Sequence, residues 1–242
     1  MKNLLKIFSI LTFSASVSIA ALATGGSGEK TIKISSGSTT HNSEVVSQTA
    51  HHPETSVDLD EIDFLEMLNS VPLDSKSAAL IRKFQEKEGR NRLHAREYND
   101  KNGCSVETFR NKEVLLITIP ASKLFSPNDT VLRPTASALL APLKRYLKDP
   151  DMYRVLMVMH TDNTGSEVYR DRLTEKRSQA VADWFENSGA DTEFLFPYAY
   201  GDDMPLVKNN TMANREKNRR LEVYLVPGKK MLEQAKKGRI VF

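Results

Sequence analysis

Residues 157–177 read Met-Val-Met-His-Thr-Asp-Asn-Thr-Gly-Ser-Glu-Val-Tyr-Arg-Asp-Arg-Leu-Thr-Glu-Lys-Arg, and the fold is predicted outward from this stretch. The apolar run 154–159 has the length of a buried strand, and the Asn-Thr-Gly after Asp162 is typical of a turn. A helix is predicted from Ser166, whose hydroxyl can cap the first turn. The stretch therefore predicts a strand, a tight turn and a helix in succession.

The predicted helix has one apolar face that also contains a charged residue. The apolar members recur at three- and four-residue steps and are Tyr169, Leu173, Ala180, Val181, Trp184 and Phe185. Arg177 falls on the same face, and burying its guanidinium without a partner would cost on the order of several kcal/mol. Two interpretations are possible. Arg177 pairs with Asp162 at the end of the preceding strand, or Asp162 and Arg177 together hold a ligand.

Length and composition limit the classes of protein that fit. The chain has 242 residues, which suggests one domain with extensions or two small domains. Its 40% hydrophobic residues suffice for one core but not for a membrane-spanning bundle. A net charge of +3 with 7% aromatic residues does not indicate nucleic-acid binding. The single cysteine, Cys104, excludes an intrachain disulfide and a Cys-based metal cluster, so we expect an inert, partly buried thiol.

The chain divides into segments of different composition. The expected segments are a signal peptide (1–23), a flexible Ser/Thr-rich linker (24–57), a charged helical region (58–104), a globular domain (105–228) and a basic C-terminal tail (229–242). The first segment has a basic start, an apolar body and the small-x-small ending Ala21-Leu22-Ala23; an uncleaved membrane anchor is the alternative. No cysteine lies near that ending, so we expect no lipid anchor.

The charged region predicts helices and not a barrel. Asp58 could cap a helix that runs to Leu68, and Ser75 begins a second that runs to about Gly89. The following residues, 90–101, are ambiguous. A transmembrane β-barrel needs repeated strands of about ten alternating residues, which this region does not supply.

The globular segment alternates strands with helices. The expected elements are a hairpin (106–110 with 113–119), a helix (134–147), the strand 154–159, the helix 166–188, a strand (194–200), a short helix (213–217), a strand (220–226) and a basic helix packed on the outside (229–237). This order implies an α+β fold, a two-layer sandwich in which helices cover one face of a mixed sheet.

Four sequence motifs follow one another in order. They are His160-Thr-Asp-Asn-Thr-Gly165 with Leu173-Thr-Glu-Lys-Arg177; Tyr200-Gly-Asp202 ahead of Asn209-x-Thr211; Arg215-x-x-Asn218-Arg-Arg-Leu-Glu-Val; and, upstream, Leu124-Phe-Ser-Pro-Asn128. Together they resemble the OmpA-like (OmpA/Pal/MotB) peptidoglycan-binding domain over roughly residues 105–226. The resemblance implies a βαβαβ(α)β fold, and it implies no cofactor.

The resemblance also implies a ligand, the diaminopimelate residue of the peptidoglycan stem peptide. Its main ligands in the family correspond here to Asp162 and Arg177. The free end of diaminopimelate carries an ammonium and a carboxylate on one carbon, and an aspartate and an arginine suit these two groups. A buried structural ion pair between Asp162 and Arg177 is the competing interpretation.

Further residues are implied around this pair. Thr164 and the backbone N–H groups of its turn could add donors, and Asn128 could line the pocket beside Phe125, which is itself more typical of a core residue. Arg215 could contribute charge, whereas Asn218, Arg219 and Arg220 are more typical of scaffold that ties the last strand to the loop. Arg170 stands where the family usually has asparagine and bears on which form of the stem peptide is accepted. With only two candidate ligands in view, His160 and Asp162 do not indicate a metal site.

The sequence thus predicts a non-catalytic module that binds peptidoglycan in the periplasm or cell envelope, with the outer membrane as one place of attachment. Serine-hydrolase and zinc-protease motifs are not found, which argues against an enzyme. The alternative is an envelope structural or assembly protein that uses the same fold for protein–protein contacts. Residues 58–104 or the tail 229–242 would then contact other envelope proteins.

Overall fold

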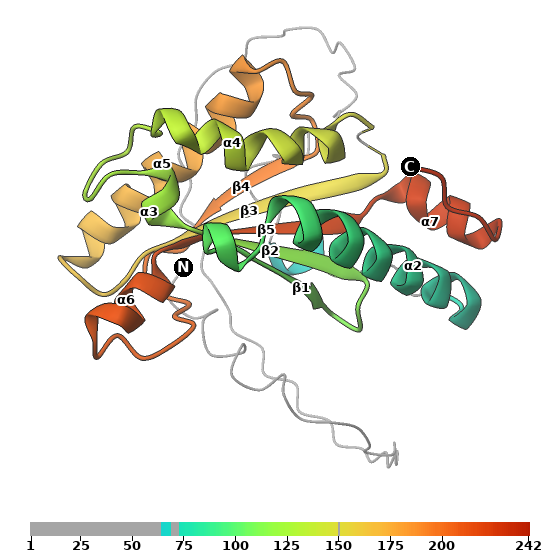
Figure 1. Cartoon of the computed structure of the whole chain (residues 1–242), viewed down its shortest axis with the longest axis horizontal. Coiled ribbons are helices and arrows are strands. Elements are labelled where there is room, and N and C mark those ends of the chain that lie inside the picture. The colour runs from blue at the N-terminus through green and yellow to red at the C-terminus, as the bar shows by residue number, and fades with distance from the viewer. Residues whose placement is uncertain (1–63, 69–72, 150) are drawn as a thin grey trace, which may run out of the picture. The chain divides into compact units, whose positions relative to one another are not determined.

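The computed structural model describes residues 64–68, 73–149 and 151–242 (Figure 1). The expected signal peptide, the expected linker and the proposed cap at Asp58 lie outside the described residues. The helix expected to end at Leu68 is described from Phe64, as the short helix α1 (Phe64–Leu68).

Within the described residues, five strands form one mixed sheet. They are β1 (Ser105–Phe109), β2 (Val114–Pro120), β3 (Tyr153–His160), β4 (Leu195–Ala199) and β5 (Arg220–Pro227), in the spatial order β1-β2-β5-β3-β4. β3 and β4 run parallel, whereas the other neighbours are antiparallel. Every residue of β5 is buried, so β3 and β5 form the centre of the sheet. The α+β fold with a mixed sheet is confirmed.

The helical segments stand between and beside the strands. They are α2 (Ser75–Glu88), a π-helix (Gly89–Glu97), a 3-10 turn (Asp100–Asn102), α3 (Ala121–Leu124), a 3-10 turn (Pro134–Ala136), α4 (Ser137–Leu140), a 3-10 helix (Ala141–Leu147), α5 (Glu167–Asn187), α6 (Met212–Asn218) and α7 (Lys229–Lys236). The ambiguous stretch 90–101 is thus largely a π-helix that continues α2.

Side-chain caps explain where the two long helices begin. The Asp74 carboxylate accepts hydrogen bonds from the backbone N–H groups of Lys76 and Ser77, both at 3.0 Å. The Ser166 hydroxyl accepts one from the Tyr169 N–H at 3.3 Å. These caps satisfy backbone donors that have no partner within the helix. The helix starts predicted at Ser75 and Ser166 are confirmed to within one residue.

The helix predicted over 134–147 is broken into shorter pieces. A 3-10 turn, one turn of α-helix and a second 3-10 helix follow one another between Pro134 and Leu147. Pro142 stands at the start of the last piece and has no backbone N–H to donate to the preceding turn. An α-helix cannot run through it undisturbed, and this explains the difference from the sequence pattern.

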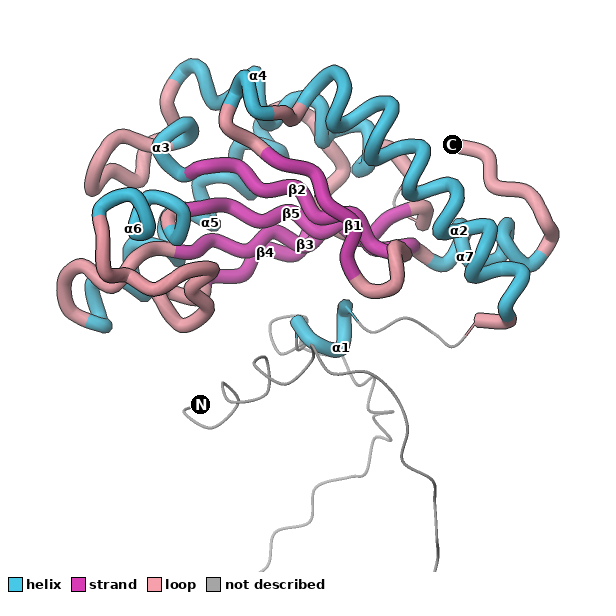
Figure 2. Tube along the Cα trace, turned by 60° about the horizontal axis from the view of Figure 1, so that its bottom comes forward, coloured by secondary structure: helices cyan, strands magenta, loops and turns pink. Residues whose placement is uncertain are grey.

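Hydrophobic side chains fill both sides of the sheet. The larger core lies between the sheet and a layer that includes α2, α5 and α7. On the opposite face, Phe64 and Met67 of α1 pack on β-strand residues that include Leu156 and Tyr224. Figure 2 shows α1 across the sheet from α2 and α4. The main helical layer is the predicted one, and α1 adds a small patch to the other face.

The C-terminal tail is part of the core. Met231 of α7 is fully buried and Ala235 nearly so. The Phe242 ring stacks on Tyr146 with 5.7 Å between ring centroids. The basic helix expected over 229–237 is α7, whose apolar side faces the core while its lysines face solvent.

Candidate functional site

The motif residues meet in a pocket at one end of the sheet. A cavity of about 370 Å³ is lined by residues of α3 and the loop after it, by the residues that follow β3, and by α5 and α6. In Figure 1, α3, α6 and the start of α5 gather at this end. The carboxyl end of β3 delivers Asp162, and the first turns of α5 deliver Leu173 and Arg177 to the same cavity.

Asp162 is a buried, ionised carboxylate with two partners. It is 3% exposed. One oxygen accepts a hydrogen bond from the Thr164 N–H at 2.7 Å, and the other forms an ion pair with the Arg219 guanidinium. Burial raises the pKa of Asp162, but the hydrogen bonds from Thr164 and the charge of Arg219 lower it more, so the pKa lies below its usual value. The carboxylate is therefore ionised, with Arg219 as its counter-ion.

Arg177 is held by the loop that follows α3. It is 4% exposed. Its Nε donates to the Asp129 carbonyl at 2.8 Å and its Nη2 to the Ser126 carbonyl at 3.2 Å. Its guanidinium carbon lies 4.9 Å from the centre of the Phe125 ring, a cation–π contact. Burial lowers the pKa of Arg177, although a guanidinium stays protonated over the whole neutral range.

Asp162 and Arg177 do not form the ion pair that the sequence suggested. The carboxylate pairs with Arg219, and two N–H groups of Arg177 are used on backbone carbonyls. The structural ion-pair interpretation is therefore wrong for these two residues. Both nevertheless line the same cavity, so the second possibility, a ligand held between them, fits the geometry.

Arg219 and Glu216 are pocket residues that the sequence reasoning missed. Arg219 pairs with both Asp162 and Glu216 and was expected to be scaffold only. A signal existed in the register of the sheet, because β3 and β5 are antiparallel with His160 opposite Arg220. The residue before Arg220 must then lie beside the residues after His160. The position of Arg219 beside Asp162 cannot be predicted unless β3 and β5 are known to be neighbours.

Asn128 and Thr164 lie where the motifs placed them. Both line the cavity. Asn128 adopts a left-handed backbone conformation with φ of 58°, and its Oδ1 accepts a hydrogen bond from the Tyr169 hydroxyl at 3.2 Å. Asparagine tolerates this conformation better than most residues. Phe125 is 1% exposed, which confirms it as a core residue, and its ring also reaches the cavity.

Arg170 and Arg215 lie outside the cavity lining. Arg170 donates from Nε to the Asp202 carboxylate and from Nη1 to the Gly165 carbonyl, both at 2.6 Å, and so ties the turn after β3 to the loop after β4. Arg215 donates to the Asn209 carbonyl at 3.1 Å. Both arginines are thus occupied in holding loops around the pocket, while their expected contact with a ligand stays a prediction.

A second polar cluster lies buried at the start of β5. The Glu222 carboxylate accepts from Arg220 Nε and the Tyr224 hydroxyl, both at 2.7 Å, and lies 3.3 Å from His160 Nε2. Asn218 bonds the Val207 backbone on both its N–H and its carbonyl. Asn218 and Arg220 therefore act as scaffold, as expected. His160 is explained as a packed histidine of this cluster.

Within the part of the chain that the structure describes, no group of three His, Cys, Asp or Glu side chains is placed to hold a metal ion. None of the described helices is both long and apolar enough to cross a bilayer. Cys104 is buried, and burial raises the pKa of its thiol to about 11, which agrees with the inert thiol expected.

Comparison with known proteins identifies the domain. A model of the OmpA family matches residues 124–219. The outer-membrane lipoprotein YfiB of Pseudomonas aeruginosa is 34% identical over 104 residues, which are 43% of this chain and 61% of YfiB. Outer membrane protein A of Bordetella avium is 26% identical over 114 residues, which are 47% of this chain and 59% of that protein. The chain thus spans about three fifths of the length of these curated relatives.

A solved structure has a similar fold. A MotB-like protein from Desulfovibrio vulgaris superposes with a TM-score of 0.54 at 23% sequence identity, over 62% of this chain and 95% of that one, and so shares the fold. Residues 124–219 are an OmpA-like domain. OmpA-like domains belong to a non-catalytic family and typically bind peptidoglycan in proteins that anchor the cell envelope. In this OmpA-like domain, the pocket around Asp162 and Arg177 joins the motifs that the family shares.

Proposed function

We propose that this OmpA-like domain binds peptidoglycan through the diaminopimelate residue of the stem peptide and so tethers or organises the cell envelope. The observation that carries the proposal is that Asp162 and Arg177 line one cavity without neutralising each other. An anionic and a cationic group in one cavity suit a ligand that carries an ammonium and a carboxylate on one carbon.

The hydrogen-bonding groups of Arg177 and Asp162 that the protein itself does not use fit this ligand. Arg177 uses Nε and Nη2 on the loop, and within the described residues its Nη1 has no hydrogen-bond partner. The Asp162 oxygens accept hydrogen bonds from Thr164 and Arg219, and a carboxylate has about four lone-pair sites, so acceptor capacity remains for an ammonium. The cavity of about 370 Å³ is large enough for the end of an amino-acid side chain, and the exposed residues Tyr169 and Asn128 are part of its lining.

The proposed function also indicates where in the cell the protein acts. The relatives named above are outer-membrane proteins by name, and a peptidoglycan ligand requires exposure to the cell wall. We infer that the protein acts in the periplasm or cell envelope, with residues 1–23 as the export signal, residues 24–57 as a linker, and 105–228 as the wall-binding domain. The alternative function is assembly of other envelope proteins by the same fold.

Co-sedimentation with purified diaminopimelate-type peptidoglycan tests the proposal. We expect the protein to pellet with the wall and to be displaced by free diaminopimelate but not by pimelate, which lacks both ammonium groups. Asp162→Asn and Arg177→Gln should each weaken binding about tenfold or more, because each leaves a charged ligand group without its partner. A wall with lysine in place of diaminopimelate should bind poorly.

Matched controls separate the pocket from general charge. Asp183→Asn and Arg172→Gln make the same changes at exposed positions of α5 outside the cavity lining, and both should pellet like the unchanged protein. Circular dichroism verifies that each variant is folded. If the pocket variants pellet as well as the controls, the ligand assignment is wrong and the assembly function is favoured.

A further inference from the structure

Two apolar side chains in the lining of the candidate pocket are exposed. Asp162 and Arg177 are 3% and 4% exposed, whereas Tyr169 and Met212 of the same cavity are 41% and 69% exposed. The lining thus changes from buried charged groups to exposed apolar ones, here called the apolar pair (Tyr169 and Met212). Single exposed hydrophobic side chains are common on protein surfaces, so exposure alone assigns the pair no role.

Tyr169 is held in place although it is exposed. Its hydroxyl donates a hydrogen bond to Asn128 Oδ1 at 3.2 Å. A Cβ at Gly165 would lie 2.8 Å from a carbon of the Tyr169 ring, so the ring packs directly on the glycine of the turn after β3. The loop after α3 and the turn after β3 therefore restrain this side chain at both its hydroxyl and its ring.

Met212 is held from a different element. It is the first residue of α6, which begins where the Thr211 hydroxyl accepts a hydrogen bond from the Asn214 N–H at 3.1 Å. Arg215 donates from Nη2 to the Met212 sulfur and from Nη1 to the Asn209 carbonyl, both at 3.1 Å. Arg215, which lies outside the cavity lining, thus restrains a residue inside it. Apolar groups that are already held lose little conformational freedom when a ligand covers them.

The chemistry of the proposed ligand limits what the apolar pair can contact. If the free end of diaminopimelate lies between Asp162 and Arg177, its methylene chain leads outward to the end that is part of the stem peptide. The residue before diaminopimelate is a glutamate with a carboxylate of its own. The residue after it is D-alanine, whose side chain is a methyl group, and the sugars lie further along the chain. The alanine methyl is therefore the apolar side chain nearest to the bound end.

We propose that Tyr169 and Met212 bind the methyl group of the D-alanine that follows diaminopimelate, so that the pocket selects stem peptides that retain this alanine. The inference rests on the diaminopimelate-binding function proposed above. The charged end of diaminopimelate binds at Asp162 and Arg177, while the methyl group covers the exposed apolar pair. Removing one methyl group from water strengthens binding by a factor of about three to four.

Two synthetic tetrapeptides that end in D-alanine or in glycine test the proposal by isothermal titration calorimetry. They carry the same charges and differ only in the methyl group. We expect the alanine peptide to bind the protein about threefold to fourfold more tightly than the glycine peptide. Met212→Ser should reduce this ratio to about one, whereas Met212→Leu, which keeps an apolar side chain, should preserve it.

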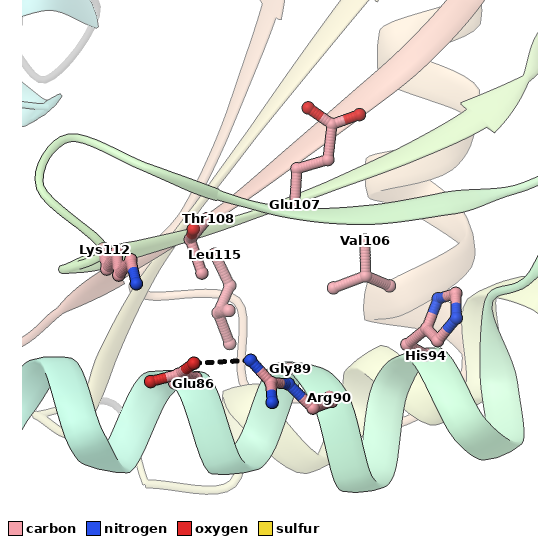
Figure 3. Close-up of a pocket in the computed structure, with 9 residues that line it drawn as sticks. All are labelled: Glu86, Gly89, Arg90, His94, Val106, Glu107, Thr108, Lys112 and Leu115. Carbon is pink, nitrogen blue, oxygen red and sulfur yellow. Dashed lines mark hydrogen bonds and ion pairs between the residues drawn. The ribbon is translucent and has the colours of Figure 1, made fainter.

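Two control variants change exposed residues elsewhere. Leu206→Ser also replaces an exposed apolar side chain, since Leu206 is 56% exposed and lies outside the cavity lining. Arg90→Gln alters a second cavity of about 520 Å³, in which Arg90 pairs with Glu86 at 2.5 Å (Figure 3). The two cavities share no lining residue. Both controls should keep the threefold to fourfold ratio, and circular dichroism verifies that every variant is folded.

Free diaminopimelate separates this inference from the proposed function. Met212→Ser should weaken the alanine tetrapeptide more than it weakens free diaminopimelate, which has no alanine. If free diaminopimelate binds but the two tetrapeptides bind equally, the alanine contact is wrong and the proposed function stands. Equal weakening of both ligands by Met212→Ser, or a ratio lost equally in Leu206→Ser, also overturns the contact. If neither free diaminopimelate nor the tetrapeptides bind, both proposals are wrong.

Discussion

Arg219, and not Arg177, forms the ion pair with Asp162. Arg219 stands immediately before β5, so the antiparallel neighbour of β3 brings the cation to the carboxylate. Arg177 approaches the same cavity from α5 but is anchored to the loop at Ser126 and Asp129. In the pocket, Asp162 therefore has its own counter-ion, whereas Arg177 is fixed by neutral carbonyls.

The first prediction concerns the two roles of Arg177. Arg177→Lys keeps the positive charge but cannot donate to two carbonyls in the geometry of a planar guanidinium or stack on Phe125 in the same way. We expect the free energy of unfolding to fall by about 1–3 kcal/mol, because buried carbonyls lose their donors. Urea denaturation measures the change. Asp129→Asn, which leaves the backbone carbonyl in place, is the control and should cost less than about 1 kcal/mol.

The second prediction concerns the proton affinity of Asp162. Arg219→Gln removes a charge that lowers the pKa of this carboxyl, whereas burial, which raises the pKa, remains. A ligand ammonium needs the ionised carboxylate, so peptidoglycan binding should fail at a higher pH in the variant than in the unchanged protein. Co-sedimentation between pH 3 and pH 8 measures both midpoints. Coincident midpoints would show that Arg219 does not tune Asp162.

The third prediction is acid destabilisation through the buried cluster around Glu222. Although burial raises the pKa of Glu222, its bonds to His160, Arg220 and Tyr224 lower it from the usual 4.5 to about 2. Burial also lowers the pKa of His160 below the usual 6.5, against the opposing hydrogen bond to Glu222. Both groups bind protons more readily in the unfolded chain, so the stability they contribute at neutral pH is lost as pH falls.

The pH windows follow from these directions. The contribution of His160 starts to fall as pH drops below about 6.5, and that of Glu222 is lost between about 4.5 and about 2. We expect a loss of roughly 2–4 kcal/mol between pH 7 and pH 2 from this cluster. Urea denaturation as a function of pH measures it. Glu222→Gln should lower stability at pH 7 and flatten the acid decline, and an unchanged slope would contradict the assignment.

The fourth prediction separates steric from conformational requirements for glycine. A Cβ at Gly228 would lie 2.2 Å from the Asp151 carbonyl oxygen, so Gly228→Ala must move the backbone where β5 meets α7. We expect a loss of about 2–3 kcal/mol. At Gly238, with φ of +80°, no atom lies within 4 Å of an added Cβ, so Gly238→Ala should cost only the backbone strain of about 1–2 kcal/mol. Equal losses in thermal or urea unfolding would contradict this distinction.

Local patterns in the sequence predicted most of the elements. The strand before Asp162, the turn that follows it and the helix capped by Ser166 all depend on residues close together in the chain. Hydrophobic periodicity and helix caps involve residues within one or two helical turns of each other, so they can be recognised in the sequence. It was less successful at 134–147, where Pro142 breaks the regular helix, and at 90–101, where the helical period changes to that of a π-helix.

The candidate site, like the fold, was only partly predictable from the sequence. By itself, the sequence determined that Asp162 ends a buried strand and that Arg177 lies on the buried side of a helix. Only the tertiary structure decided that Arg219 is the partner of Asp162 and that carbonyls of Ser126 and Asp129 hold Arg177. The physical reason is distance along the chain: Asp162 and Arg219 are 57 residues apart and meet only because β3 and β5 pair in one antiparallel register.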